Sequence, residues 1–119
     1  MTRIFVYGTL KRGCCRSQVL KNQRFLGPAR TAAKYRMYDT GSYPALIEAE
    51  DGIEIEGELW EVDEACLRVL DAIEDVPTLY IRQPVDLQSP EAGDSQTYIY
   101  RQNVSGMPAC GSRWVEKRR

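Results

Sequence analysis

A single helical stretch among many short extended ones is the feature that most constrains how this chain can fold. Between Asp63 and Ile73 the apolar residues recur at the spacing of one helix face, and Asp63 is suited to cap the start of that helix. Pro77 limits how far the helix can continue. The other apolar stretches are short and are separated by turns that contain glycine or proline. The pattern predicts an α+β fold: a small, mixed, curled sheet that resembles a barrel, with few helices.

Several stretches have the periodicity or composition of strands. The first, Ile4 to Tyr7, is a continuous run of β-branched and aromatic residues, so we expect it to be buried on both faces at the centre of the sheet. A short, weakly helical piece is expected at Ser17 to Asn22, and a break in regular structure at Gly27-Pro28. The other predicted strands are Thr31 to Tyr38, Ala45 to Ile47, Ile53 to Trp60, Leu79 to Leu87 and Gln96 to Tyr100.

Three carboxylates alternate along the predicted strand from Ile53 to Trp60. Glu54, Glu56 and Glu58 fall on one face of that strand, and apolar residues fall on the other. Such a row could hold a metal ion or take part in acid catalysis, but a solvated strand face is the commoner reason for it. We therefore expect these side chains to face solvent.

The length and composition of the chain favour one folded domain. Its 119 residues fall below the size at which a second domain becomes worth considering. The shares of hydrophobic residues, 43%, and of charged residues, 28%, are close to the averages for globular proteins. We find no internal repeat, linker or low-complexity segment. We expect residues 1–119 to form a single domain.

The charge and the start of the sequence restrict the partners and the compartment. With 16 basic and 17 acidic residues, the chain lacks the positive excess of a nucleic-acid-binding protein. Met1-Thr2-Arg3 leads directly into Ile4 to Tyr7, an apolar run that is far too short for a signal peptide or a membrane span. We expect a cytoplasmic protein that acts on a small molecule, without nucleic acid or membrane. The sequence makes no prediction about the oligomeric state.

The chain contains no histidine, and this removes several kinds of site. Neither a catalytic triad with a histidine base nor a Cys/His dyad can be built. Cys14 and Cys15 are adjacent, whereas Cys66 and Cys110 lie far from them, so the spacing does not fit a zinc site. We expect thiols rather than disulfides, no metal site and no cofactor.

Two features of the sequence could carry chemistry. Gly8 ends the first predicted strand, so the backbone N–H groups of Gly8, Thr9 and Leu10 could converge on an anion. An ordinary turn is the alternative. Glu74 follows Ile73 at the end of the helical stripe, where partial burial would raise its pKa and make it a better proton acceptor near neutral pH. The alternative is a polar helix end at which Glu74 and its acidic neighbours face water.

Four segments occur in an order and at a spacing that together carry a family resemblance. They are Phe5-Val6-Tyr7-Gly8-Thr9-Leu10-Lys11-Arg12-Gly13, Gly41-Ser42-Tyr43-Pro44-Ala45, Gly57-Glu58-Leu59-Trp60-Glu61-Val62, and Leu70-Asp71-Ala72-Ile73-Glu74-Asp75 continuing to Tyr80-Ile81-Arg82. In these segments the chain resembles the γ-glutamylcyclotransferase-like family, and most closely its γ-glutamylamine cyclotransferase, YtfP-like and AIG2-like branch. The resemblance implies a closed, barrel-like α+β fold with the site in a cavity at one end.

The resemblance also implies a reaction and the residues that perform it. In that reaction the α-amine of the substrate attacks its own γ-glutamyl carbonyl, which forms 5-oxoproline and expels an amine without a cofactor. Glu74 matches the family's catalytic glutamate, which transfers the proton. A loop would grip the γ-glutamyl group through backbone N–H donors, and two tyrosines would line the cavity. These binding residues are Tyr7, Gly8, Thr9 and Leu10 in the loop, with Tyr43 and Tyr80.

Two other functions stay open at this point. A protein of the same fold could bind a γ-glutamyl compound or another small acid without converting it, because a fold does not dictate a reaction. A thiol enzyme could use Cys14 or Cys15, which lie in a glycine-bracketed loop with a few basic neighbours. Ligand-induced thermal stabilisation without a product would indicate the binding protein. Turnover that survives alkylation of both thiols would exclude the thiol enzyme.

Overall fold

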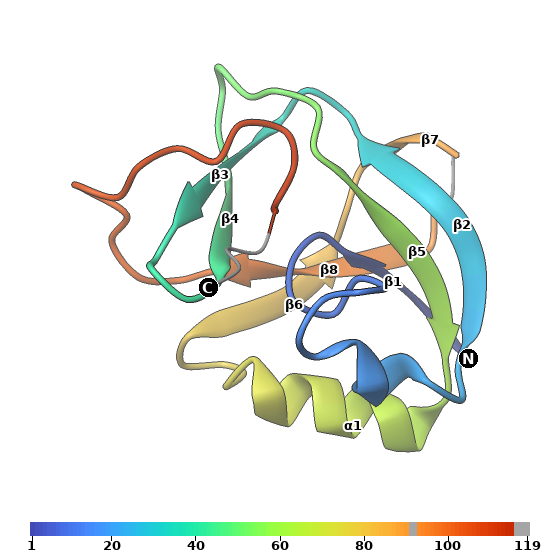
Figure 1. Ribbon diagram of the computed structural model, residues 1–119. Coiled ribbons are helices and arrows are strands. Elements are labelled where there is room, and N and C mark those ends of the chain that lie inside the picture. Colours follow the sequence, from blue (N-terminus) through green and yellow to red (C-terminus); the bar gives the residue numbers. More distant parts are fainter. Residues whose placement is uncertain (91–92, 116–119) are drawn as a thin grey trace.

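The fold centres on a six-stranded sheet that curls around an apolar interior (Figure 1). The computed structural model describes residues 1–90 and 93–115. The order of strands across the sheet is β6-β8-β1-β5-β2-β7, and β3 and β4 form a separate two-stranded sheet. The elements in chain order are β1 (Thr2–Val6), the 3-10 helix η1 (Ser17–Leu20), β2 (Arg24–Thr31), β3 (Tyr35–Asp39), β4 (Pro44–Glu48), β5 (Glu56–Val62), α1 (Glu64–Ile73), β6 (Tyr80–Pro84), β7 (Leu87–Ser89) and β8 (Ser95–Tyr100).

Strand β1 lies in the middle of the large sheet, as its sequence predicted. It pairs antiparallel with β5 and parallel with β8. Ile4, Phe5 and Val6 are at most 3% exposed, so the strand is covered on both faces. Because β1 ends at Val6, the chain that follows leaves the sheet from its centre rather than from an edge.

The alternation of side chains along β1 creates two apolar cores. Phe5 belongs to the interior of the curled sheet, together with Met37 from β3. Ile4 belongs to the other core, which it shares with Leu20 of η1 and Leu70 of α1. Figure 1 shows α1 lying along this outer side of the sheet, next to η1. The second core therefore attaches the helix to the central strand.

Helix α1 begins and ends as the sequence predicted. The Asp63 carboxylate accepts a hydrogen bond from the amide of Cys66 at 2.8 Å, which satisfies one of the unpaired donors of the first turn. The helix ends at Ile73. Asp75 then adopts a left-handed backbone conformation, with a φ of 51°, and this turns the chain out of the helix before Pro77.

The predicted break at Gly27-Pro28 is wrong, because both residues lie inside β2. A bulge in the pairing between Phe25 and Gly27 accommodates the glycine, whose φ is 132°. Proline has no N–H group to donate to a neighbouring strand. Pro28 is tolerated because β7, the second neighbour of β2, pairs only with the last two residues of β2 and does not reach Pro28. The stretch predicted as the next strand therefore divides between the end of β2 and β3.

The stretch predicted as one strand from Leu79 to Leu87 forms two strands at opposite edges of the sheet, β6 and β7. Val85 and Asp86 connect the two strands. The amide of Val85 donates to the carbonyl of Ser95 at 3.0 Å, and the carbonyl of Asp86 accepts from the amide of Ala32 at 2.8 Å. One extended segment thus contacts both edges and gives the sheet its barrel-like shape.

The row of Glu54, Glu56 and Glu58, which begins before β5 and continues into it, is only partly solvated, contrary to the prediction. Glu54 forms an ion pair with Arg30, with 2.8 Å between Oε1 and Nε. The Glu58 side chain is 14% exposed and accepts a hydrogen bond from the backbone amide of Arg12 at 3.0 Å. Glu56 is exposed. Within residues 1–90 and 93–115, no group of three or more histidine, cysteine, aspartate or glutamate side chains is arranged to hold a metal ion.

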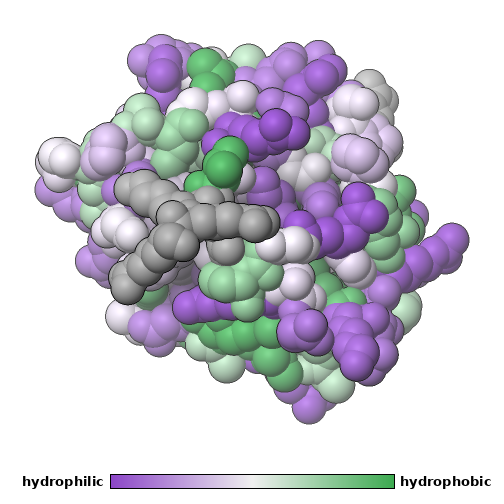
Figure 2. Space-filling model, viewed as in Figure 1, coloured by the Kyte–Doolittle hydropathy of each residue, from purple (hydrophilic) through white to green (hydrophobic). Residues whose placement is uncertain are grey.

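Apolar residues lie scattered among hydrophilic ones on the face seen in Figure 2. Single exposed apolar side chains of this kind are ordinary on folded proteins and do not mark a binding surface by themselves. In the part of the chain that is described, no helix combines the length and apolar character needed to cross a membrane. The exposed large apolar side chains are Met1, Leu26, Val69, Ile81 and Val115.

Candidate active site

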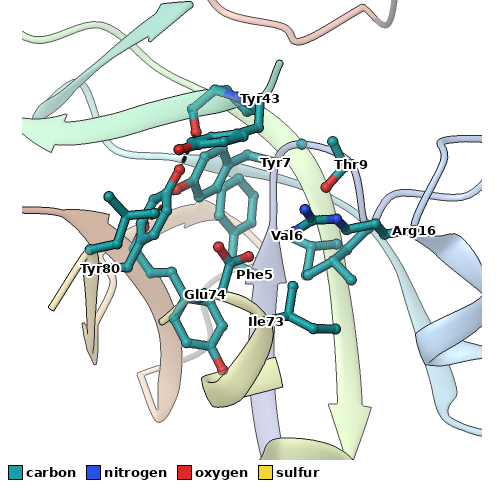
Figure 3. Close-up of a pocket in the computed structure, with 14 residues that line it drawn as sticks. Phe5, Val6, Tyr7, Thr9, Arg16, Tyr43, Ile73, Glu74 and Tyr80 are labelled. Atoms are coloured by element: carbon teal, nitrogen blue, oxygen red, sulfur yellow. Dashed lines mark hydrogen bonds between the residues drawn. The ribbon is translucent and has the colours of Figure 1, made fainter. Parts of the chain in front are cut away.

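Every residue that the sequence assigned to a site lines one cavity, at the place where β1, the end of α1 and β6 meet (Figure 3). The cavity has a volume of about 620 Å³, part of which is open to solvent. The two candidate features, the loop after β1 and the glutamate at the end of α1, are therefore parts of the same site. The predicted residues that line it are Tyr7, Gly8, Thr9, Leu10, Tyr43, Glu74 and Tyr80.

In the loop after β1, several backbone N–H groups donate no hydrogen bond to the described residues. The carbonyl of Gly8 accepts a hydrogen bond from the amide of Lys11 at 3.1 Å, and the carbonyl of Thr9 accepts one from the amide of Arg16 at 2.8 Å. In contrast, the amides of Gly8, Thr9 and Leu10 have no hydrogen-bond partner among the described residues. Consecutive unpaired amides at the wall of a cavity can bind an anion or a developing negative charge.

Glu74 lies at the C-terminal end of α1, and its carboxylate points into the cavity (Figure 3). Burial raises the pKa of this carboxyl group from its ordinary value of 4.5 to about 7, and the nearby Arg16 guanidinium opposes part of that shift. Of the acidic residues at this helix end, Glu74 alone lines the cavity, since Asp71 pairs with Arg82 and Asp75 is exposed. The alternative of a uniformly solvated helix end is therefore wrong.

A network of polar side chains holds the last turn of α1 against β6 and β8. Arg82 donates to both carboxylate oxygens of Asp71, at 3.0 Å and 3.2 Å. The Tyr98 hydroxyl donates to Asp71 at 2.7 Å, and Arg82 donates to Gln96 at 2.6 Å. Because Asp71 precedes Glu74 by one helical turn, this network restricts where the Glu74 carboxylate can lie.

Hydrogen bonds hold the hydroxyl groups of two cavity tyrosines, Tyr7 and Tyr80, in place. The Tyr7 hydroxyl donates to the carbonyl of Tyr98, and the Tyr80 hydroxyl donates to the carbonyl of Pro44, each at 2.7 Å. Burial raises the pKa of both phenols well above their ordinary value, and the Glu74 charge adds to the effect. The Tyr43 and Tyr80 rings lie 6.3 Å apart and form an aromatic wall. With their raised pKa values, Tyr7 and Tyr80 shape the cavity and are not suited to act as bases.

The cysteines lie outside the cavity. Cys14 is partly exposed and Cys15 is exposed, and neither lines the wall. Cys66 is buried between α1 and η1, where its Sγ lies 3.7 Å from the carbonyl oxygen of Val19. All four cysteines are in the described part of the chain, and none of them is in a disulfide. The structure therefore lends no support to a thiol enzyme that uses this cavity.

The raised pKa of Glu74 predicts a pH-dependent stability. A carboxyl group whose pKa rises on folding is favoured in its protonated form, so its contribution is present below about pH 4.5 and is lost as the pH rises through about 7. Glutamine does not titrate. We therefore expect Glu74→Gln to match the wild type near pH 4 and to be more stable near pH 8, by about 1 to 3 kcal/mol. Urea unfolding at a series of pH values measures this difference, and a difference that does not change with pH would contradict it.

Known proteins match the chain over nearly its full length. A sequence model of the family described as "Gamma-glutamyl cyclotransferase, AIG2-like" matches residues 4–116. The chain belongs to this family. The γ-glutamylcyclotransferase family protein YtfP of Escherichia coli K12 is 31% identical over 116 residues, which is 97% of each chain. The mouse γ-glutamylaminecyclotransferase is 35% identical over 118 residues, which cover 84% of this chain and 77% of the mouse protein.

A solved structure supports the fold in the same way. The crystal structure of an AIG2-like protein from Mus musculus superimposes with a TM-score of 0.81 at 26% identity, covering 100% of this chain and 98% of the mouse chain. The resemblance and the α+β fold with its curled sheet are thus confirmed. Membership of the family supports an activity of the γ-glutamylcyclotransferase type.

The segments that carried the resemblance converge on the cavity of this γ-glutamylcyclotransferase family member. The first supplies the loop, the second supplies Tyr43 and Pro44, and the fourth supplies Glu74 and Tyr80. The third forms β5, where Gly57 lets Phe5 and the central strand approach closely. Residues far apart in the sequence therefore either line this cavity or pack against the central strand that leads into it.

Sequence reasoning missed several residues of the cavity wall. Some of these residues are next to predicted site residues in the sequence, so no separate sequence motif is needed to explain why they line the cavity. Arg16 and Tyr98 differ, because only the tertiary fold brings η1 and β8 to the cavity. No spacing or motif in the sequence marks either of them. The missed residues are Phe5, Val6, Arg16, Pro44, Ile73, Leu79 and Tyr98.

Proposed function

We propose that this protein converts a γ-glutamyl amine into 5-oxoproline and a free amine. The observation that carries the proposal is that a carboxyl group with a pKa of about 7 and a loop with unpaired amides share one cavity. The name of the mouse relative, γ-glutamylaminecyclotransferase, supports the class of substrate.

The proposed reaction needs no nucleophile from the protein. The nitrogen of the substrate's α-amine forms a bond to its γ-carbonyl carbon, and the bond from that carbon to the leaving nitrogen breaks. The attacking nitrogen loses a proton and the leaving nitrogen gains one. The protein has to fold the glutamyl chain into the geometry of attack, stabilise the negative charge on the carbonyl oxygen and move the proton.

Glu74 is suited to move that proton. With a pKa of about 7, a substantial fraction of its carboxyl group is ionised at neutral pH and can accept the proton, and the protonated form can donate it to the leaving nitrogen. The amides of Gly8, Thr9 and Leu10 are the proposed donors to the carbonyl oxygen. Tyr7, whose hydroxyl is engaged by a carbonyl group, forms part of the wall that surrounds the glutamyl chain.

Release of 5-oxoproline from a panel of γ-glutamyl compounds tests the proposal. The panel includes γ-glutamyl-lysine and glutathione, and the proteins are the wild type, Glu74→Gln and Asp75→Asn. Asp75 is the matched control because it is the next residue, carries the same charge and does not line the cavity. We expect product from at least one compound with the wild type and Asp75→Asn, and release that is slower by about 100-fold or more with Glu74→Gln.

Two outcomes would contradict the proposal in different ways. If Glu74→Gln released product as fast as the wild type, Glu74 would not be the proton-transferring residue. If the wild type released no product while γ-glutamyl compounds raised its melting temperature, the protein would be a binding protein of the same fold.

A substitution at Gly8 tests the role of the loop. A Cβ atom at this position would lie 2.6 Å from Cγ of Pro44, so alanine would push apart two walls of the cavity. We expect Gly8→Ala to raise the KM for a γ-glutamyl substrate by about 10-fold or more, because the loop donors no longer converge as they do in the wild type. Steady-state kinetics measure the change, and an unchanged KM and kcat would show that the loop does not contact the substrate.

A further inference from the structure

We propose that Arg16 binds a carboxylate of the substrate, so that this cavity selects γ-glutamyl compounds by their negative charge. The inference rests on the proposed function and adds a specificity-determining residue to it. Three observations carry it: how the backbone of Arg16 is held, where its side chain points, and whether its guanidinium group has an ion-pair partner.

The backbone of Arg16 is attached to the loop of the site. Its amide donates a hydrogen bond to the carbonyl of Thr9 at 2.8 Å. Arg16 also directly precedes η1, whose Leu20 is fully buried beside the central strand. The position of Arg16 relative to the unpaired amides of the loop is therefore set by the fold rather than by a mobile surface segment.

The side chain of Arg16 reaches into the cavity. Figure 3 shows the guanidinium group extending from the η1 side toward the space between Thr9 and Glu74. Its charge acts on both Glu74 and Tyr80, the residues of the opposite wall. A ligand in this space would thus lie within reach of the guanidinium group, the loop amides and the Glu74 carboxylate together.

The guanidinium group of Arg16 has no ion-pair partner among the described residues. Arg3, Arg68, Arg101 and Arg113 also have no ion-pair partner in the described part of the chain, but none of them lines this cavity. An acidic side chain lies within 4.0 Å of the guanidinium of Arg12, Arg24, Arg30, Arg36 and Arg82. An unpaired guanidinium beside unpaired amides makes this wall of the cavity suited to an anion, and the planar guanidinium fork fits a carboxylate in particular.

A γ-glutamyl amine offers such a carboxylate in two places. The glutamyl part carries its own α-carboxylate, and a leaving amine that is an amino acid carries a second one. A polyamine leaving group would instead bring positive charge toward Arg16, which is unfavourable. The chemistry of recognition is the same for both carboxylates, so the experiment has to separate them.

Binding measured without turnover separates the two carboxylates and also separates this inference from the proposed function. The protein is Glu74→Gln, alone and combined with Arg16→Gln. The ligands are γ-glutamylglycine, its glutamyl α-carboxamide and γ-glutamylglycinamide. Isothermal titration calorimetry gives the Kd of each pair. With Glu74→Gln alone, we expect amidation of one carboxylate to weaken binding by about 10- to 100-fold, the usual effect of losing a charged hydrogen-bonded contact.

With the double variant, we expect the same amidation to change the Kd by less than about 3-fold, because the group that distinguishes acid from amide is gone. The carboxylate whose amidation ceases to matter is the one that Arg16 binds. If the double variant still discriminated as strongly as Glu74→Gln, or if Glu74→Gln did not discriminate at all, the inference would be wrong. Neither result depends on whether the wild type releases 5-oxoproline.

Arg12→Gln in the Glu74→Gln background is the matched control. It removes the same charge from the same loop, but the Arg12 guanidinium lies 3.8 Å from the centre of the Phe25 ring and does not line the cavity. We expect this control to discriminate as Glu74→Gln does. Arg16→Lys, which keeps the charge without the fork, is expected to discriminate to an intermediate degree. Equal losses in the Arg12 and Arg16 variants would indicate a general charge effect and overturn the assignment to Arg16.

Discussion

Glu74→Gln is expected to lower kcat for 5-oxoproline release by about 100- to 10,000-fold, the range in which a positioned general acid or base contributes to a rate. The variant keeps the size and shape of the side chain and removes its ability to exchange a proton. Because Glu74 lies at the helix end rather than in either apolar core, the fold should remain intact. Stopped assays for 5-oxoproline measure the rate, and circular dichroism verifies the fold. Loss of activity with an unfolded variant would not count as support.

The pH dependence of the wild type provides an independent readout of the same residue. If the ionised form of Glu74 accepts the proton, kcat/KM should rise with pH and level off above about 7, the pKa to which burial raises this carboxyl group. Asp75→Asn should show the same profile. The residual rate of Glu74→Gln should lack the inflection. A wild-type profile that is flat between about pH 6 and about pH 8 would remove Glu74 from the proton transfer.

Gly57→Ala is expected to destabilise the fold by about 3 kcal/mol, at the upper end of the usual cost of overpacking a core. A Cβ atom on Gly57 would lie 2.4 Å from the carbonyl oxygen of Val6 and 2.7 Å from Cζ of Phe5. The first of these is a backbone atom of the central strand, which cannot move without disturbing the pairing of β1 with β5. A loss of this size lowers the Tm by roughly 10 °C in a domain of about this length. Thermal and urea unfolding measure both quantities.

Gly93→Ala is the control for the glycine substitution. A Cβ atom at Gly93 meets no atom within 4 Å in the part of the chain that is described. We expect a change in stability of less than about 0.5 kcal/mol, as for most surface substitutions. If Gly57→Ala were as stable as Gly93→Ala, the close approach of β5 to the central strand would not be a constraint on the fold.

The candidate site shows where local reasoning from the sequence succeeds. The end of an apolar strand at Gly8 and the end of a helical stripe at Ile73 are features of neighbouring residues, so both could be recognised without the fold. The family resemblance joined them into one hypothesis. The cavity that contains the loop and Glu74 agrees with that hypothesis, although the roles of these residues remain proposals. Arg16 could not be found in this way, because its position beside Glu74 depends on how η1 packs against α1.

The errors in the predicted strands have a common cause. The stretch from Leu79 to Leu87 is continuously extended, and periodicity has no means of showing that its two ends pair at opposite edges of the sheet. Likewise, Gly27-Pro28 has the composition of a turn, yet it lies in β2 because a bulge and a missing neighbour allow it there. Pairing partners, rather than local preference, decided both cases.

The sequence by itself determined where the helix is capped and ends, which strand is central, and which family the chain resembles. Each of these depends on side-chain periodicity, backbone preferences or the order of motifs along the chain. Only the tertiary structure decided how the sheet closes, which carboxylate is buried enough to have a pKa of about 7, and which arginine shares a cavity with it. These properties arise from contacts between residues distant in sequence, because burial and electrostatic surroundings exist only once the chain has packed.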